Sequence, residues 1–342
     1  KPDAQESRGL GDVYKRQVLG LGNTGALASK PVMEGKGVLF KRFADIDVYD
    51  IEIDCEDPDE FIQTVVNISP TFGGINLEDI AAPECFYIES ELKKRLSIPV
   101  FHDDQHGTAV IVAAGLINAL EIQQKLIEKV KIVFLGAGAA GCSCARLLKL
   151  MGATDITMVD SKGILSNDRK NLNQYNQDLA IDTKGKTFND AIQHADVFIG
   201  VSGANLLKDE HVKSMSKKPI IFALANPDPE MLPSEAHAIR DDIVMATGRS
   251  DFDNQVNNVL GFPFLFKGAL EAKAKQINTD MLIAAANALA LLAKEPVPQS
   301  VLEAYDVAEL NFGPNYIIPK PFDPRLIDWV AKAVKEAYKE DK

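Results

Sequence analysis

Three acidic runs stand at the ends of apolar, strand-like segments of this sequence. They are LED (77–79), HDD (102–104) and the end of ALANPDPE (223–230). Neighbouring residues of a regular strand point to opposite faces, so Glu78 and Asp79 can share one ion only if the strand ends there. Three carboxylates without Cys or paired His suit Mg²⁺ or Mn²⁺ rather than Zn²⁺. From spacing alone, acids at solvated loop ends are an equally good interpretation.

A glycine pattern, GAGAAG (136–141), lies in the context of a dinucleotide-binding unit. It follows the strand-like KIVFL, opens a helix-like segment and precedes a second strand that ends in Asp160, nineteen residues after Gly141. Such glycines let the backbone approach a pyrophosphate at a helix N-terminus, and the acid binds ribose hydroxyls. We therefore predict cofactor contacts from Gly136, Gly138, Ala139, Ala140, Gly141 and Asp160.

A second GxGxxG pattern, GLGNTG (20–25), lacks this context. It follows the short apolar run VLGLG, but no strand ending in an acid arrives at the right distance. The motif alone is weak evidence. We interpret this segment as a loop that approaches substrate rather than a second dinucleotide site.

Strand-like and helix-like segments alternate along the chain, which indicates an α/β fold. The first half predicts strands at 47–54, 68–79 and 97–104, with a helix after Asp57 that begins on a first-turn Pro. A long buried helix follows at 107–123. The second half predicts strands at 131–136, 155–160, 196–202, 219–226 and 243–248. These runs are apolar on both faces, as a parallel sheet covered by helices requires.

Composition excludes several classes of function. The chain has 342 residues and a formal net charge of −12, which disfavours nucleic acid as a partner. Its apolar runs are too short to span a membrane. Four cysteines without CxxC spacing indicate reduced thiols and a cytoplasmic protein. The length favours two domains.

Seven segments, in this order, resemble the signature segments of short bacterial malic enzymes. The resemblance runs from about Val18 to the C-terminus, and the segments are VLGLGNTGALASKPVMEGKGVLFKRFADIDV, SPTFGGINLEDIAAPECFYIE, IPVFHDDQHGTA, GAGAAG, FALANPDPE, ATGRSDFDNQVNNVLGFP and YIIPKPFDPRL. It implies a partial N-terminal malic-enzyme domain (18–104), a doubly wound, Rossmann-like NAD(P)-binding domain with a C-terminal helix (105–342), and a homodimer.

The resemblance also assigns roles to residues. It implies that Lys36 is the general base with Asp103 beside it, and that Glu78, Asp79 and Asp104 bind Mg²⁺ or Mn²⁺. Asn226 and Asn258 match contacts to substrate and nicotinamide. Malate would then be oxidised at C2 by NAD or NADP and lose CO₂ to give pyruvate, with the metal as Lewis acid. We expect His102 and His106 to pack or support rather than bind the metal.

The sequence departs from the family pattern near its N-terminus, and it leaves the choice between NAD and NADP open. The family carries a Tyr-Thr-Pro-Gly segment whose Tyr protonates the enolate, and Tyr14 in YKRQ does not match it. We therefore expect an N-terminally truncated chain whose residues 1–17 are a flexible tail or foreign sequence, so that either a partner chain supplies the acid or the last step is impaired. Because Asp160 favours NAD, we expect NAD as the preferred cofactor, and NADP stays open because Lys162 could compensate its 2′-phosphate.

Two other functions fit the dinucleotide unit. A 2-hydroxy-acid or amino-acid dehydrogenase would turn over without metal and leave the carbon skeleton intact. A non-catalytic dinucleotide-binding module would bind NAD without any Mn²⁺-dependent turnover.

Overall fold

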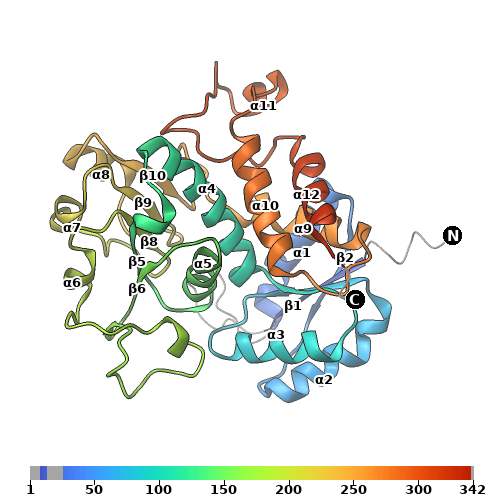
Figure 1. Cartoon of the computed structure of the whole chain (residues 1–342). Helices are drawn as coiled ribbons and strands as arrows, with labels where there is room; N and C mark the ends of the chain where they lie inside the picture. Colours follow the sequence, from blue (N-terminus) through green and yellow to red (C-terminus); the bar gives the residue numbers. More distant parts are fainter. Residues whose placement is uncertain (1–7, 14–25, 340–342) are drawn as a thin grey trace. The chain divides into compact units, whose positions relative to one another are not determined.

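The computed structural model describes residues 26–339 and the backbone of residues 8–13 (Figure 1). VLGLG, GLGNTG and Tyr14 lie outside the described residues. The chain divides into two compact units: unit 1 comprises residues 1–110, 258–289 and 323–342, and unit 2 comprises residues 111–257 and 290–322. Within the described part of the chain, no helix has both the length and the apolar character that a membrane span needs.

Unit 1 contains a four-stranded parallel sheet in the order β2-β1-β3-β4. The strands are β1 (Arg8–Val13), β2 (Asp47–Glu52), β3 (Gly74–Glu78) and β4 (Val100–His102). Strand β1 lies in the segment 1–17, where the sequence analysis predicts no strand. Its backbone pairs with both β2 and β3. The sequence does not predict this strand, because RGLGDV lacks an apolar run.

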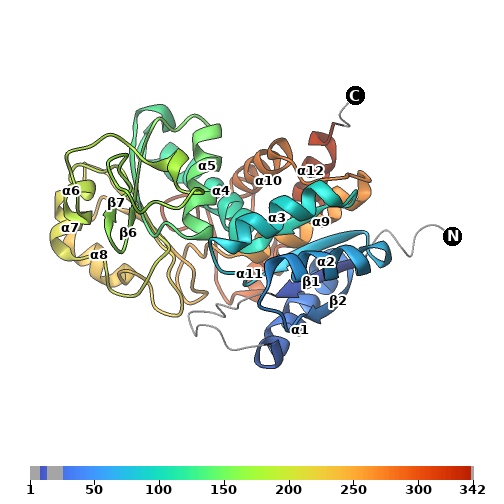
Figure 2. The same cartoon turned by 90° about the horizontal axis from the view of Figure 1, so that it is seen from below.

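Helices α1 (Ala26–Ala44), α2 (Pro58–Ile68) and α3 (Glu84–Arg95) accompany this sheet, and α2 and α3 run side by side (Figure 2). Helix α2 begins as predicted: the Asp57 side chain accepts a hydrogen bond from the Asp59 N–H at 2.8 Å, and Pro58 occupies the first turn. Strand β3 is buried on both faces. The sheet therefore holds the end of β3 rigidly.

Segments from late in the chain return to unit 1. They are the turn η6 (Asn258–Leu260), α9 (Phe262–Glu271), most of α10 (Thr279–Leu292), the π-helical turn η7 (Ile327–Ala331) and α12 (Lys332–Ala337). Our domain prediction placed all of them with the dinucleotide-binding half. Aromatic packing explains the difference, because Phe40 contacts the rings of Phe262 and Phe266 at centroid distances of 4.7 and 5.4 Å. Contacts between distant segments of this kind are invisible in a linear reading of the sequence.

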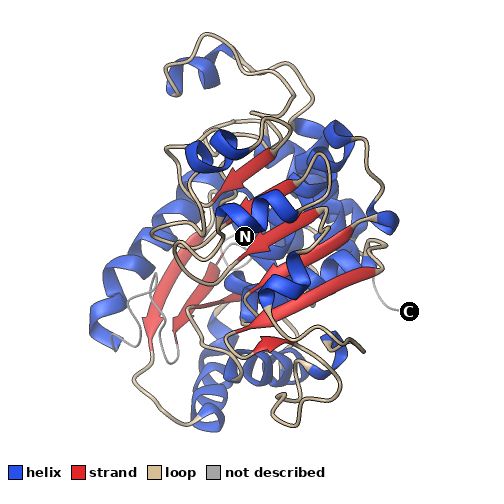
Figure 3. Ribbon diagram, turned by 90° about the vertical axis from the view of Figure 1, so that its left-hand side faces the viewer, coloured by secondary structure: helices blue, strands red, loops and turns tan. Residues whose placement is uncertain are grey.

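Unit 2 contains a six-stranded sheet in the order β10-β9-β8-β5-β6-β7 (Figure 3). All neighbours are parallel except the short antiparallel pair β6–β7. The strands are β5 (Lys131–Leu135), β6 (Asp155–Asp160), β7 (Gly163–Ile164), β8 (Val197–Gly200), β9 (Ile220–Ala223) and β10 (Val244–Thr247). The predicted strands of the second half are confirmed within one to three residues at their ends, and β7 was missed because it has only two residues.

Helices cover both faces of this sheet. On one side lie α5 (Ala139–Leu150) and the unit 2 part of α4 (Thr108–Gln123), and on the other α6 (Phe188–Ile192), α7 (Asp209–Ser214) and α8 (Pro233–Ile239) (Figure 1). Helix α11 (Gln299–Ala304) and the turns η4 (Ile127–Lys129) and η5 (Gln177–Leu179) complete the unit. The α/β, doubly wound class predicted from the sequence is confirmed. In such sheets ligands bind at the carboxyl ends of the strands, beside the point where strand order reverses.

Candidate functional site

The carboxylates of Glu78, Asp79 and Asp104 come together in unit 1. One oxygen of each lies within 4.8 Å of the others. Strand β3 ends at Glu78, and Asp79 has a φ of 55°, so the chain turns and the two side chains no longer point to opposite faces. The third acid belongs to the π-helical turn η3 (Asp103–Gly107), and its Oδ2 accepts a hydrogen bond from the Asp79 N–H at 2.8 Å. Two strand ends thus build one group of oxygens.

Lys36 lies beside this group, although it comes from helix α1. Its Nζ donates to Glu78 Oε1 at 3.0 Å and to Asp103 Oδ2, and it stands 4.0 Å from the centre of the Phe262 ring. Asp103 is completely buried, and 15% of the Lys36 side chain is exposed. The amine therefore has two carboxylate partners, an aromatic wall and one accessible side.

The charges in this cluster do not balance. The cluster contains four carboxylates, those of Glu78, Asp79, Asp103 and Asp104, and one ammonium group, which contacts Glu78 and Asp103. Burial alone would lower the pKa of Lys36, but the charges of Asp103 and Glu78 outweigh it and raise that pKa. Burial, together with the neighbouring acids, raises the pKa of Glu78 well above its usual value. A bound cation would relieve this excess of negative charge.

Asn258 joins the same cluster. Its Nδ2 donates to Asp103 Oδ2 at 3.2 Å, and Thr108 Oγ1 donates to its Oδ1 at 3.2 Å. We expected Asn258 in the cofactor half of the chain, but the structure places it in unit 1 beside Asp103. A glycine is required nearby, because a Cβ at Gly107 would lie 1.9 Å from Asp103 Oδ1. The turn is thus shaped around the Asp103 carboxylate.

Two supporting residues were missed by the sequence analysis. Asn76 lies two residues before Glu78 on the same face of β3, and its Nδ2 donates to Glu78 Oε2 at 2.9 Å. Glu89 of α3 accepts from Gln105 Nε2 at 3.2 Å and lies 2.7 Å from His106 Nε2. The two-residue period of a strand could have identified Asn76, whereas no local signal connects α3 with the HDD turn.

His102 and His106 are not part of the oxygen group, as expected. His102 is completely buried, its ring nitrogens have no hydrogen-bond partner among the described residues, and burial lowers its pKa. His106 pairs with Glu89 instead. We interpret the first as a packing residue and the second as a support of the turn.

The glycine turn of unit 2 has the geometry that a pyrophosphate needs. Gly136 follows β5 with a φ of 121°, and α5 begins at Ala139. A Cβ at Gly141 would lie 2.0 Å from the Gly136 carbonyl oxygen, whereas one at Gly138 would meet nothing within 4 Å. The first and third glycines are therefore needed for close packing, and the middle one leaves open space at the helix N-terminus.

Asp160 ends β6 as predicted, but its carboxylate already has a partner. Arg169 donates to both of its oxygens, at 2.9 and 2.8 Å, and the Lys162 N–H donates at 2.8 Å. Burial would raise the pKa of Asp160, and these hydrogen bonds reverse that effect and lower it. Arg169 was missed by the sequence analysis, because nothing marks an Arg in a loop nine residues after Asp160.

The third acidic run, ALANPDPE, does not join the oxygen group. Asn226 follows β9 and is exposed, and its amide lies against Gly248, where a Cβ would be 3.1 Å from Asn226 Nδ2. The run belongs to unit 2, whereas the oxygen group found among residues 26–339 consists of Glu78, Asp79 and Asp104. Asp228 instead pairs with Arg249, and Glu230 is buried against backbone N–H groups.

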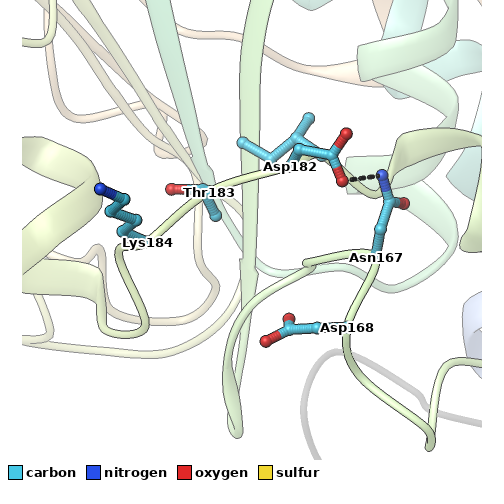
Figure 4. Close-up of a pocket in the computed structure, with 6 residues that line it drawn as sticks. Asn167, Asp168, Asp182, Thr183 and Lys184 are labelled. Atoms are coloured by element: carbon cyan, nitrogen blue, oxygen red, sulfur yellow. Dashed lines mark hydrogen bonds between the residues drawn. The ribbon is translucent and has the colours of Figure 1, made fainter.

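An open pocket in unit 2 contains none of the predicted site residues (Figure 4). Three of its polar side chains already have partners: Asn167 donates to Asp182 at 2.8 Å, and Asp168 accepts from Lys186 at 2.6 Å. The lining residues are Asn167, Asp168, Ile181, Asp182, Thr183 and Lys184. We assign it no role in the chemistry.

Comparison with protein families finds matches in both the N-terminal and the dinucleotide-binding part of the chain. Residues 105–304 match the malic enzyme NAD binding domain, and residues 15–58 and 55–93 match the malic enzyme N-terminal domain. The chain belongs to the malic enzyme family. The resemblance noted in the sequence is thereby confirmed. The N-terminal match contains Lys36, Glu78 and Asp79, and the NAD-binding match contains the glycine turn and Asp160.

Individual malic enzymes are similar to this chain in sequence and in structure. An NADP-dependent malic enzyme of Halomonas elongata is 57% identical over 322 residues, which cover 94% of this chain and 76% of that protein. An NADP-dependent malic enzyme of Rhizobium meliloti is 55% identical, but the match covers only 42% of its length. The crystal structure of an NAD-dependent malic enzyme from Thermotoga maritima superposes with a TM-score of 0.87 at 43% identity, covering 97% of this chain and 84% of that one.

Proposed function

We propose that this malic enzyme oxidises malate at C2 with NAD(P)⁺ and releases its C4 carboxyl group as CO₂, leaving pyruvate. The observation that carries the proposal is the position of Lys36. Its amine contacts Asp103 and Glu78 at the edge of the oxygen group, where a hydroxyl bound to that group would come within reach of a base. A simple dehydrogenase needs no such group of acids.

The oxygen group suits a divalent metal ion. Glu78, Asp79 and Asp104 offer hard carboxylate ligands from a rigid strand end and a shaped turn, which Mg²⁺ and Mn²⁺ prefer. The excess of carboxylates over the single ammonium supports the same conclusion. When bound, the ion would act as a Lewis acid toward the malate hydroxyl and carboxylate.

Lys36 would accept the C2 hydroxyl proton, for which its amine must be neutral. The carboxylates of Asp103 and Glu78 hold it protonated. Neutralising the charge on Glu78 would lower the pKa of Lys36 toward a useful range. Asp103 would then keep the amine in place, and Asn258 would fix Asp103 through its hydrogen bond.

We further propose that NADP is the preferred cofactor. An unpaired Asp160 would repel the 2′-phosphate of NADP, but its charge is compensated by Arg169, which makes two hydrogen bonds to it. Lys162 adds a second cation beside the same ribose position. The names of the Halomonas and Rhizobium relatives point the same way, although another Rhizobium relative, 51% identical, is named NAD-dependent.

We also propose a homodimer in the cytoplasm. The family resemblance supports the dimer, and four free cysteines, three of them buried, suit a reducing compartment. Sedimentation of the purified protein tests the dimer directly.

Turnover of malate tests the main proposal. We expect NADPH to form from malate and NADP⁺ only with Mn²⁺ or Mg²⁺ present, with one CO₂ released per NADPH. A chelator should stop both. NADPH formation that survives chelation without CO₂ would instead identify a simple dehydrogenase, and dinucleotide binding without turnover would identify a binding module.

A further inference from the structure

Glu230 is a buried carboxylate that the proposed chemistry does not use. It is completely buried, although it belongs to the acidic run that we first considered for the metal. Its Oε1 accepts a hydrogen bond from the Ser202 N–H at 3.0 Å, and its Oε2 accepts one from the Ala225 N–H at 3.1 Å. No cationic side chain within the described part of the chain lies within ion-pair distance of it. One side chain therefore joins the segment after β8 to the segment after β9.

The surroundings are shaped for this carboxylate. Gly200, the last residue of β8, has no room for a side chain, because a Cβ there would lie 2.3 Å from Glu230 Cδ. Burial raises the pKa of Glu230, and the backbone N–H groups oppose that effect. A buried acid without a cation costs stability, so its presence calls for a specific task.

Backbone hydrogen bonds strengthen the same connection. The Leu207 N–H donates to the Glu230 carbonyl at 3.1 Å, and the Asn205 N–H donates to the Pro229 carbonyl at 3.0 Å. The segments 201–207 and 225–230 are thus fastened to each other, with the Glu230 carboxylate at the point where both leave the sheet. Asn226 lies within the second segment.

These two segments occupy a defined place on the sheet. They follow neighbouring parallel strands, and β8 is also the neighbour of β5, which carries the glycine turn. That turn contacts the first segment closely, because a Cβ at Gly136 would lie 2.7 Å from the Val201 carbonyl oxygen. If the glycine turn binds the pyrophosphate and Asp160 the adenosine ribose, the nicotinamide half extends over the ends of β8 and β9.

We propose that Glu230 is a positioning residue, which holds the segments 201–207 and 225–230 in the arrangement that receives the nicotinamide half of the dinucleotide. The inference rests on the dinucleotide binding of the proposed function, but not on the decarboxylation. Glu230 itself need not touch the cofactor, since it acts through the backbone of Ser202 and Ala225.

The test compares a whole dinucleotide with a fragment that lacks nicotinamide. In Glu230→Gln the side chain keeps its shape, but its amide cannot accept both N–H groups, so one buried donor is left unpaired. We expect NADPH to bind about tenfold more weakly, measured by its fluorescence without malate or metal. The affinity for 2′-phospho-ADP-ribose and for Mn²⁺ should not change. In turnover, KM for NADP⁺ should rise while KM for malate changes little.

Glu235→Gln is the matched control. Glu235 also accepts a backbone hydrogen bond, from the Leu232 N–H at 3.0 Å, but it is exposed on α8. The Glu235→Gln variant should bind NADPH and 2′-phospho-ADP-ribose as tightly as the unaltered protein does. Gly200→Ala should cause the same defect as Glu230→Gln, because the new methyl group displaces the Glu230 carboxylate without removing it. In the double variant Gly200→Ala/Glu230→Asp the acid is shorter and makes room for this methyl group, so part of the NADPH affinity should be restored.

Each result has a definite meaning. Equal weakening of NADPH and the fragment in both Glu230→Gln and Gly200→Ala would show a general support of the fold and overturn the proposal. Unchanged NADPH affinity in folded variants would also overturn it, as would failure of the unaltered protein to bind either ligand. NADPH binding that responds as expected in a protein that releases no CO₂ would leave the positioning role standing and remove the decarboxylation instead.

Discussion

The two units of this malic enzyme differ in how the charges of their acids are compensated. In unit 1, four carboxylates lie in one cluster and two of them contact the ammonium of Lys36, so that the negative charge is in excess. In unit 2, each acid that matters is matched individually: Asp160 has Arg169, and Glu230 has two backbone N–H groups. An excess of like charge is costly unless a ligand completes it, whereas a matched acid fixes the structure around it.

This difference separates the expected effects of substitution. Removing a charge from the cluster in unit 1 should alter metal binding and the chemical step. Removing one from unit 2 should alter dinucleotide binding or the choice between NAD and NADP. A substitution in one unit that changed the property assigned to the other would break the comparison.

The largest effect is expected for Lys36→Ala. Loss of the general base should lower kcat by about 10²–10⁴-fold, because no other amine is held at this position by Asp103 and Glu78. NADPH affinity should not change. Lys41→Ala, on the same helix with an exposed ion pair to Asp47, is the control and should retain full turnover. Full activity in Lys36→Ala would remove Lys36 from the mechanism.

Asp104→Asn should come next. It keeps the shape of the turn but removes one of the three ligand charges, so Mn²⁺ should bind on the order of 100-fold more weakly, as measured by titration of the metal. Asp47→Asn, an exposed acid on β2 of the same unit, should leave Mn²⁺ affinity unchanged. If both variants bind Mn²⁺ equally well, the metal lies elsewhere.

A smaller effect is expected for Arg169→Gln, which tests unit 2. Without Arg169, the Asp160 carboxylate becomes free to repel a 2′-phosphate and to accept the ribose hydroxyl of NAD. The ratio of kcat/KM for NADP to that for NAD should fall about 30-fold. Arg240→Gln is matched, since Arg240 makes the same pair of hydrogen bonds to Asp242, and it should leave the ratio unchanged. A ratio unaffected by Arg169→Gln would contradict the role of Arg169 in cofactor choice.

The sequence predicts the fold of unit 2 well, because its information is local. Each strand of the parallel sheet is a short apolar run, and the turn between β5 and α5 is marked by Gly136 and Gly141. Unit 1 is less predictable. Its core depends on contacts such as that of Phe40 with Phe262, which are 222 residues apart and leave no periodic signal.

The candidate site, too, can be predicted only where its information is local in the sequence. The ends of β3 and β4 could be recognised as acidic strand ends, but spacing could not choose between a metal site and solvated loops. The positive φ of Asp79 and the turn that contains Asp104 bring the three carboxylates together, and neither feature can be recognised in the sequence. Arg169 lies in a loop nine residues after Asp160, and Glu89 lies in a helix 17 residues before His106, and no local pattern links either pair in the sequence.

The smallest effect concerns Glu89, whose charge is matched although it lies in unit 1. Burial alone would raise its pKa, but His106 and Lys93 lower it well below the usual range. Glu89→Gln should lower the free energy of unfolding by about 1 kcal/mol at neutral pH, measured by denaturant titration. Glu91→Gln, whose partners Lys94 and Arg95 form surface pairs on the same helix, should change it less.

The pH dependence of this difference follows from the direction of the shift. Because the pKa of Glu89 is lower in the folded chain than in the unfolded chain, where it is about 4.3, the acid stabilises the fold fully above that value. The stabilisation is lost as the pH falls toward the folded pKa, since the unfolded chain then binds a proton that the paired carboxylate of the folded protein resists. The gap between the unaltered protein and Glu89→Gln should therefore narrow below about pH 4.3. A gap that widened on acidification would mean that Glu89 is not held as a carboxylate by its partners.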